Sequence, residues 1–123
     1  MADYIPERND IVSLDFEPKK RKRGGNSYAV LVLSSKDYNE KTGLLIGCPV
    51  STDIEGHVTE VPIDDLEKPS VVTASLVHTL AWRERQVKFI TKVKNNVMGD
   101  VLSRLVPLIG ADRIVMLRMQ PSR

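Results

Sequence analysis

The stretch that decides the fold is residues 12–50, VSLDFEPKKRKRGGNSYAVLVLSSKDYNEKTGLLIGCPV. It predicts three strands, at residues 10–16, 28–34 and 44–50, because apolar residues fill these segments and polar segments separate them. The second segment, YAVLVLS, is almost wholly apolar, which indicates a central strand buried on both faces. Residues 35–43 contain Asp, Asn and Gly, which are typical of a tight turn.

The loop between the first two predicted strands, residues 17–27, is strongly basic. It carries five consecutive cations followed by two glycines. Such a run does not belong in an apolar core, so it is either a solvated loop or a place where phosphate binds. Because the run lies between strands, we favour contact with phosphates. Its cations are Lys19, Lys20, Arg21, Lys22 and Arg23.

The composition is that of a globular domain. The chain has 123 residues, of which 41% are hydrophobic and 28% charged, and a net charge of +2 that permits a polyanionic partner without requiring one. No apolar run has the roughly 18 residues that a membrane helix needs, and no secretory signal is visible. The single cysteine, Cys48, excludes an internal disulfide and a cysteine-based zinc site. We therefore expect no metal, no cofactor, no membrane partner and a cytoplasmic location.

The rest of the chain predicts further strands and one helix. Alternating apolar residues indicate strands at 57–63, 70–77 and 86–93, and Pro62 indicates that the first of these either lies at an edge or ends there. A stripe of apolar residues at a 3.6-residue period predicts a helix over 96–109.

Signals at both ends of that helix support its boundaries. Asn95 or Asn96 can cap its start, Pro107 lies in its last turn, and Gly110 stands where a helix ends. Residues 112–123 are interpreted as a tail. Six or so strands and one late helix indicate a mainly β (α+β) fold, a small barrel or strongly curved sheet with an attached helix.

Candidate binding residues follow the third strand, whose apolar run at 44–48 is predicted to end at Pro49. Ser51 and Thr52, followed by Asp53, stand at its exit, where short hydroxyl side chains either donate to a phosphate oxygen or cap the loop backbone. No P-loop, dinucleotide fingerprint or GxSxG motif is present.

Two further features allow both a functional and a structural interpretation. Trp82 with Arg83 and Arg85 could stack on and pair with a nucleotide, or be a half-buried tryptophan with solvated arginines. His57 could be a general acid or base because its ordinary pKa is near neutrality, or an ordinary surface histidine. His78, between Val77 and Thr79, is interpreted as structural.

Short groups of residues in a fixed order carry a family resemblance over about residues 4–110. In order and spacing they resemble the MazF/PemK toxins of bacterial toxin–antitoxin systems. The groups include YIP (4–6), DIV (10–12), LDF (14–16), VLS (32–34), YN (38–39), KTG (41–43), AWR (81–83) and LIG (108–110).

The resemblance implies a homodimer with a small SH3-like, plasmid-maintenance-toxin barrel. It implies a toxin domain at 1–110, followed by a C-terminal extension at 111–123. It also implies a sequence-specific endoribonuclease that cleaves single-stranded RNA without metal, and a cognate antitoxin that neutralises it. In this family the 2′-hydroxyl of the RNA attacks the adjacent phosphate, which requires a base, an acid and a cation for the developing charge.

The chain departs from the family at positions that the resemblance assigns to the site. Tyr28 stands at the position of the usual catalytic arginine, and Ser51-Thr52 at that of a threonine pair. Ser75-Leu76 replaces an Asp-Gln pair that contacts RNA, and His57 replaces an aromatic residue. The alternative to an enzyme is therefore a non-catalytic dimer that binds nucleic acid or an antitoxin and acts by occupancy.

We expect one set of residues to act in catalysis and another to bind RNA. Arg23 or Lys22 would supply the charge that Tyr28 cannot, because a phenol is neutral at pH 7. The candidate catalytic residues are Ser51, Tyr28, Arg23 and His57. The candidate RNA-binding residues are Lys19, Lys20, Arg21, Lys22, Thr52, Asp53, Arg83 and Arg85.

Overall fold

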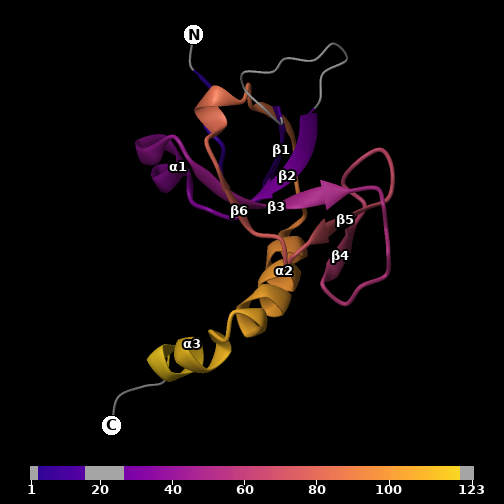
Figure 1. The fold of residues 1–123 in the computed structure, drawn as a ribbon, viewed down its shortest axis with the longest axis vertical. Helices are drawn as coiled ribbons and strands as arrows, with labels where there is room; N and C mark the ends of the chain where they lie inside the picture. Colours follow the sequence, from indigo (N-terminus) through magenta and orange to yellow (C-terminus); the bar gives the residue numbers. More distant parts are fainter. Residues whose placement is uncertain (1–2, 16–26, 120–123) are drawn as a thin grey trace.

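The computed structural model describes residues 3–15 and 27–119 (Figure 1). In these ranges seven strands form one antiparallel sheet in the order β4-β5-β3-β2-β1-β7, and β6 pairs with β3 beside this path. The predicted mainly β class and the position of β4 at an edge are both confirmed. The strands are β1 Asp10–Asp15, β2 Ser27–Val32, β3 Leu45–Ser51, β4 Glu60–Ile63, β5 Ser70–Thr73, β6 His78–Leu80 and β7 Lys88–Lys92.

The central strand β2 is buried on both faces, as its apolar sequence predicts. Its successive side chains enter two different apolar clusters, because neighbouring residues of a strand point to opposite faces. Leu31 packs with Ile11, Cys48 and residues of the long helix α2 (Asn95–Leu108), whereas Val30 packs with Leu14 and Trp82. Both Val30 and Leu31 are at most 1% exposed. Strand β2 is therefore the element on which the rest of the sheet is assembled.

Strand β3 runs through Pro49, so the prediction that this proline ends the strand is wrong. On one side Pro49 lies opposite Val30 of β2. On the other side the partner of β3 changes from β6, which pairs with residues 45–47, to β5, which pairs with residues 50–51. Pro49 falls in the gap between these partners, where no ladder requires its missing N–H.

The predicted turn at 35–43 is instead a helix, α1 (Lys36–Thr42). The Ser35 side chain caps its start by accepting from the Tyr38 N–H at 3.2 Å. Gly43 ends the helix in the left-handed conformation with φ of 73°, which glycine adopts without strain. Of the turn-forming residues in this segment, Gly43 is thus the stop signal of a two-turn helix, whereas Asp37 and Asn39 lie inside it.

The predicted C-terminal helix is confirmed as α2, with Pro107 inside it and Gly110 at φ of 71° just beyond it. The predicted asparagine cap is wrong. Lys94 is the capping residue and makes no side-chain bond to the helix, while its own N–H donates to Asp65 Oδ2 at 3.0 Å. A second correction concerns the predicted tail, where α3 (Asp112–Met119) forms and extends beyond the sheet (Figure 1).

The remaining elements are shorter than their sequence patterns predict. The expected strand at 57–63 begins only at Glu60, and the expected strand at 70–77 ends at Thr73, with β6 following the predicted range at His78. A single 3₁₀ turn, η1 (Trp82–Glu84), follows β6. Among the described helices, none is long and apolar enough to cross a membrane.

Candidate active site

An open cavity of about 530 Å³ lies where β2, β3 and β6 come together, and we call it the sheet cavity. It brings together three residues that the sequence singles out, namely Tyr28, Ser51 and Arg85. The full lining is Tyr28, Ala29, Pro49, Val50, Ser51, His78, Leu80 and Arg85.

The strand register explains why residues far apart in the sequence meet there. Ala29 lies opposite Val50 in the antiparallel pair of β2 and β3, so Tyr28 and Ser51 occupy the same end of that pair. His78 enters from the other side of β3, where it lies opposite Gly47. Gly47 is required at this position because a Cβ there would lie 2.4 Å from Val30 Cγ1 and 2.6 Å from the Leu31 carbonyl oxygen.

Arg85 is held at the edge of the sheet cavity by the end of β1. Its Nη1 donates to the carbonyl oxygen of Asp15 at 3.0 Å, and the Asp15 N–H donates to the Arg85 carbonyl at 2.9 Å. Asp15 lies opposite Ser27, the residue before Tyr28. The guanidinium is therefore positioned beside the start of β2.

Tyr28 is a neutral hydrogen-bond donor in this environment. Partial burial raises the pKa of its hydroxyl above the ordinary value of 10, and the positive charge of Arg85 offsets only part of that increase. At neutral pH the cavity thus combines a phenol O–H from Tyr28 with the positive charge of Arg85.

Ser51 has the loop-capping role that the sequence allows, and its hydroxyl proton is not used by that bond. Its Oγ accepts from the Asp53 N–H at 2.9 Å, which caps the loop after β3. A hydroxyl has one proton to donate as well as two lone pairs, so the O–H can still donate to a ligand in the sheet cavity. Thr52 and Asp53 are exposed on the same loop but do not line the cavity.

Other predicted site residues lie elsewhere. His57 is exposed on the loop between β3 and β4, where its Nε2 is 3.0 Å from Glu55 Oε1, and it does not line the sheet cavity. Arg83 lies against α1, with its Nη2 donating to the Glu40 carbonyl at 2.7 Å. The predicted cations Lys19, Lys20, Arg21, Lys22 and Arg23 fall outside the described residues.

One lining residue, His78, has a position that its sequence context does not indicate. The sequence suggests a structural histidine, but His78 is exposed on β6 and lines the sheet cavity. A three-residue strand has too little pattern to be read from sequence, so the pairing of β6 with β3 gives no signal beforehand. In the described ranges, no three His, Cys, Asp or Glu side chains are grouped so that they could hold a metal ion.

The sequence of this chain is similar to those of a known protein family. Residues 7–109 match the family described as PemK-like, MazF-like toxin of type II toxin-antitoxin system. The chain is 34% identical over 110 residues to the endoribonuclease toxin MazF of Escherichia coli strain K12, which covers 89% of this chain and 99% of that relative.

Solved structures agree with the family match. The MazE–MazF crystal structure (Form-II) from Deinococcus radiodurans superposes with a TM-score of 0.78 at 32% identity, covering 88% of this chain and 98% of that one. MazF alone (Form-I) from the same organism gives a TM-score of 0.77 at 33% identity, covering 88% and 99%. The predicted toxin-like architecture, a curved sheet with a C-terminal helix, is therefore confirmed.

Proposed function

This chain belongs to the PemK-like, MazF-like toxin family of type II toxin–antitoxin systems, and we propose that it is an endoribonuclease that cleaves single-stranded RNA. The proposal includes cleavage at a specific sequence, no requirement for metal, and a homodimer in the cytoplasm. It also includes neutralisation by a cognate antitoxin, which the MazE–MazF complex of the Deinococcus relative supports. The observation that carries it is the sheet cavity, where Arg85, Ser51, Tyr28 and His78 line one open space.

The proposed chemistry is internal transesterification. The 2′-hydroxyl oxygen attacks the adjacent phosphorus, the bond from phosphorus to the 5′-oxygen breaks, and the products carry a 2′,3′-cyclic phosphate and a 5′-hydroxyl. Negative charge builds on the non-bridging oxygens in the transition state, so preorganised donors aimed at them lower the barrier. Arg85 would supply the cation, and the hydroxyls of Ser51 and Tyr28 would each donate one hydrogen bond.

Proton transfer needs a base for the 2′-hydroxyl and an acid for the leaving 5′-oxygen. His78 lines the sheet cavity, and histidine is the side chain that most often serves as a general acid or base in enzymes. His57 lies on the loop that follows Ser51 and stays a prediction for the second role. The basic run that includes Lys22 and Arg23 stays a prediction for RNA binding and for additional charge.

The boundary between toxin domain and extension is also proposed. The family match ends at residue 109, which supports a toxin domain over 1–110. Residues 111–123 would be an extension that includes α3.

The direct test incubates purified protein with a mixed single-stranded RNA in the presence of EDTA and maps the fragment ends. Wild-type protein is expected to give fragments with 5′-hydroxyl ends at a recurrent sequence. Ser51→Ala removes one donor to the phosphate and should slow cleavage about 100-fold. Ser103→Ala, which removes an exposed hydroxyl from α2, is the matched control and should cleave at the wild-type rate. Wild-type protein that yields no such fragments would overturn the proposal.

A non-catalytic binding dimer is the second candidate, favoured by the neutral Tyr28 at a family arginine position. The two functions separate on expression without an antitoxin. The enzyme causes growth arrest with RNA decay, whereas a protein that only binds is tolerated at high expression.

A further inference from the structure

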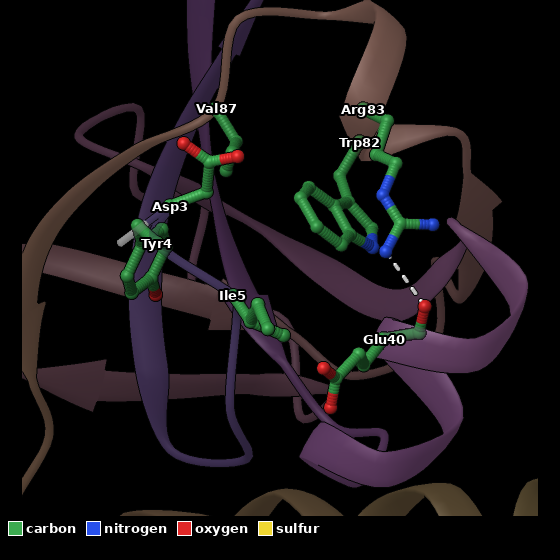
Figure 2. Close-up of a pocket in the computed structure, with 7 residues that line it drawn as sticks. All are labelled: Asp3, Tyr4, Ile5, Glu40, Trp82, Arg83 and Val87. Carbon is green, nitrogen blue, oxygen red and sulfur yellow. Dashed lines mark hydrogen bonds between the residues drawn. The ribbon is translucent and has the colours of Figure 1, made fainter. Parts of the chain in front are cut away.

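A second cavity, of about 720 Å³, is lined by residues of the N-terminal segment, α1 and η1, and we call it the N-terminal pocket. Figure 2 shows Asp3 and Tyr4 on one side of it, Trp82 and Arg83 on the other, and Ile5 between them. Its volume falls within the roughly 300–1,000 Å³ typical of ligand sites. The lining residues are Asp3, Tyr4, Ile5, Glu40, Trp82, Arg83 and Val87.

One wall of the N-terminal pocket is fixed by bonds to α1. Trp82 donates its indole N–H to the Asn39 carbonyl at 3.1 Å. The Arg83 guanidinium lies over the Trp82 ring, 4.8 Å from its centroid, and donates to the Glu40 carbonyl (Figure 2). This bond uses the backbone of Glu40, so Arg83 does not neutralise the Glu40 carboxylate through a direct salt bridge.

The opposite wall is fixed by the sheet. The Tyr4 hydroxyl donates to the buried carboxylate of Asp10, which also accepts from Lys92 on β7. The Tyr4 ring meets Phe89 edge to face, with the centroids 5.7 Å apart. Both walls are thus already in place before any ligand arrives, which lowers the entropic cost of binding.

The charge of the N-terminal pocket is opposite to that of an RNA-binding surface. Asp3 and Glu40 contribute two exposed carboxylates against the one guanidinium of Arg83, on a chain whose net charge is +2. In the part of the chain that the structure describes, neither carboxylate forms a salt bridge. Phosphates are repelled by such a rim, whereas an ammonium or guanidinium group is attracted.

The apolar part of the lining suits the stem of a basic side chain. Ile5, Val87 and the Tyr4 ring offer apolar surface between the carboxylates. Lysine and arginine bury their methylene stems on such surface while keeping the charged head in a polar environment. We propose that the N-terminal pocket binds a lysine or arginine side chain presented by a short peptide segment of a protein partner. This inference goes beyond RNA cleavage and does not rest on it.

Trp82 is the only tryptophan of the chain, so its fluorescence reports directly on the N-terminal pocket. The probe is the blocked tripeptide acetyl-Ala-Arg-Ala-amide, titrated into the full chain, and its neutral counterpart contains Gln in place of Arg. The arginine peptide should change the emission in a saturable way and bind about tenfold more tightly than the glutamine peptide, as expected for two partly solvated ion pairs.

The variant Asp3→Asn/Glu40→Gln should remove that preference. Asp37→Asn is the matched control, because it removes a carboxylate from the same helix α1 but outside the pocket, and it should leave the preference intact. Circular dichroism confirms that each variant is folded. Equal affinity for the two peptides, no saturable change, or displacement of the arginine peptide by a single-stranded oligonucleotide would overturn the proposal.

Discussion

Arg83 and Arg85 are separated by one residue, yet they lie in different cavities and make different kinds of contact. Arg83 stacks on Trp82 and donates to the Glu40 carbonyl, which links η1 to α1 on the side of the N-terminal pocket. Arg85, at the end of η1, donates to the Asp15 carbonyl and acts electrostatically on Tyr28 in the sheet cavity. Two cations that are close in sequence can thus be fixed to different elements and contribute their charge to different cavities.

The largest expected effect comes from removing each arginine in turn. Arg85→Ala takes the cation out of the sheet cavity and should slow RNA cleavage about 100- to 1,000-fold, because transition-state charge loses its main donor. Arg83→Ala removes the same charge from the N-terminal pocket and should leave the cleavage rate within about threefold of wild type, since Arg83 does not line the sheet cavity. Single-turnover cleavage of one defined RNA measures both rates. Equal losses of cleavage rate in the two variants would contradict the assignment of cleavage to the sheet cavity and not to the N-terminal pocket.

A smaller effect, on stability and not on cleavage, is expected from Asn39 in α1, the helix bonded to Trp82 and Arg83 of the N-terminal pocket. Asn39 is fully buried, its Nδ2 donates to the Pro6 carbonyl at 2.8 Å, and its Oδ1 accepts from Ser34 Oγ. Asn39→Ala leaves these buried partners unsatisfied and should lower the free energy of unfolding by about 3 kcal/mol. Urea denaturation measures the change, with the exposed Asn96→Ala as a control that should shift stability by no more than about 0.5 kcal/mol. Cleavage per folded molecule should be unchanged, and a loss of stability below about 1 kcal/mol would contradict this role for Asn39.

The smallest effect is a pH dependence that originates at Tyr4. Burial, together with the hydrogen bond to Asp10, raises the pKa of the Tyr4 hydroxyl well above its ordinary value of 10. The unfolded chain therefore loses this proton at a lower pH than the folded chain. The stabilisation from Tyr4 is complete below pH 10 and is lost progressively as the pH rises above that value.

The variant Tyr4→Phe isolates that contribution. It should cost about 1 kcal/mol at pH 7, because one hydrogen bond to a buried carboxylate is gone, and its stability should fall less steeply than that of wild type above pH 10. Burial raises the pKa of the Cys48 thiol to about 11 in both proteins, so its contribution cancels in the comparison. Parallel stability curves above pH 10 would show that Tyr4 ionises without cost to the fold.

The sequence predicted the sheet better than the short elements. The strands around residues 10–50 and the helix α2 have long apolar patterns, and packing follows such patterns directly. The helix α1 was missed because Asp37, Asn39 and Gly43 are all typical of turns, although Asp37 and Asn39 lie inside the helix and only Gly43 ends it. The helix α3 was missed because its exposed Ile114 and Leu117 show no clear buried face.

The candidate site was predicted only in part, for a reason of geometry. Ser51 and Arg85 stand out by residue type, but their proximity depends on the β2–β3 register and on the bond from Arg85 to Asp15. A single sequence shows neither the register of two strands nor a contact between residues 70 positions apart, such as Asp15 and Arg85. The position of His78 depends on a three-residue strand, which is too short to leave a pattern.

The proposed role of Arg85 is to supply in the sheet cavity the charge that, by the family resemblance of the sequence, an arginine at position 28 would supply. It is tested most directly by comparing single-turnover cleavage of one RNA by wild type, Arg85→Ala, Tyr28→Arg and the double variant. The double variant, with its cation at position 28, should cleave at least about tenfold faster than Arg85→Ala. Tyr28→Arg alone should change the wild-type rate little, because that chain still has Arg85. A double variant no faster than Arg85→Ala, alongside a Tyr28→Arg variant faster than wild type, would contradict the claim.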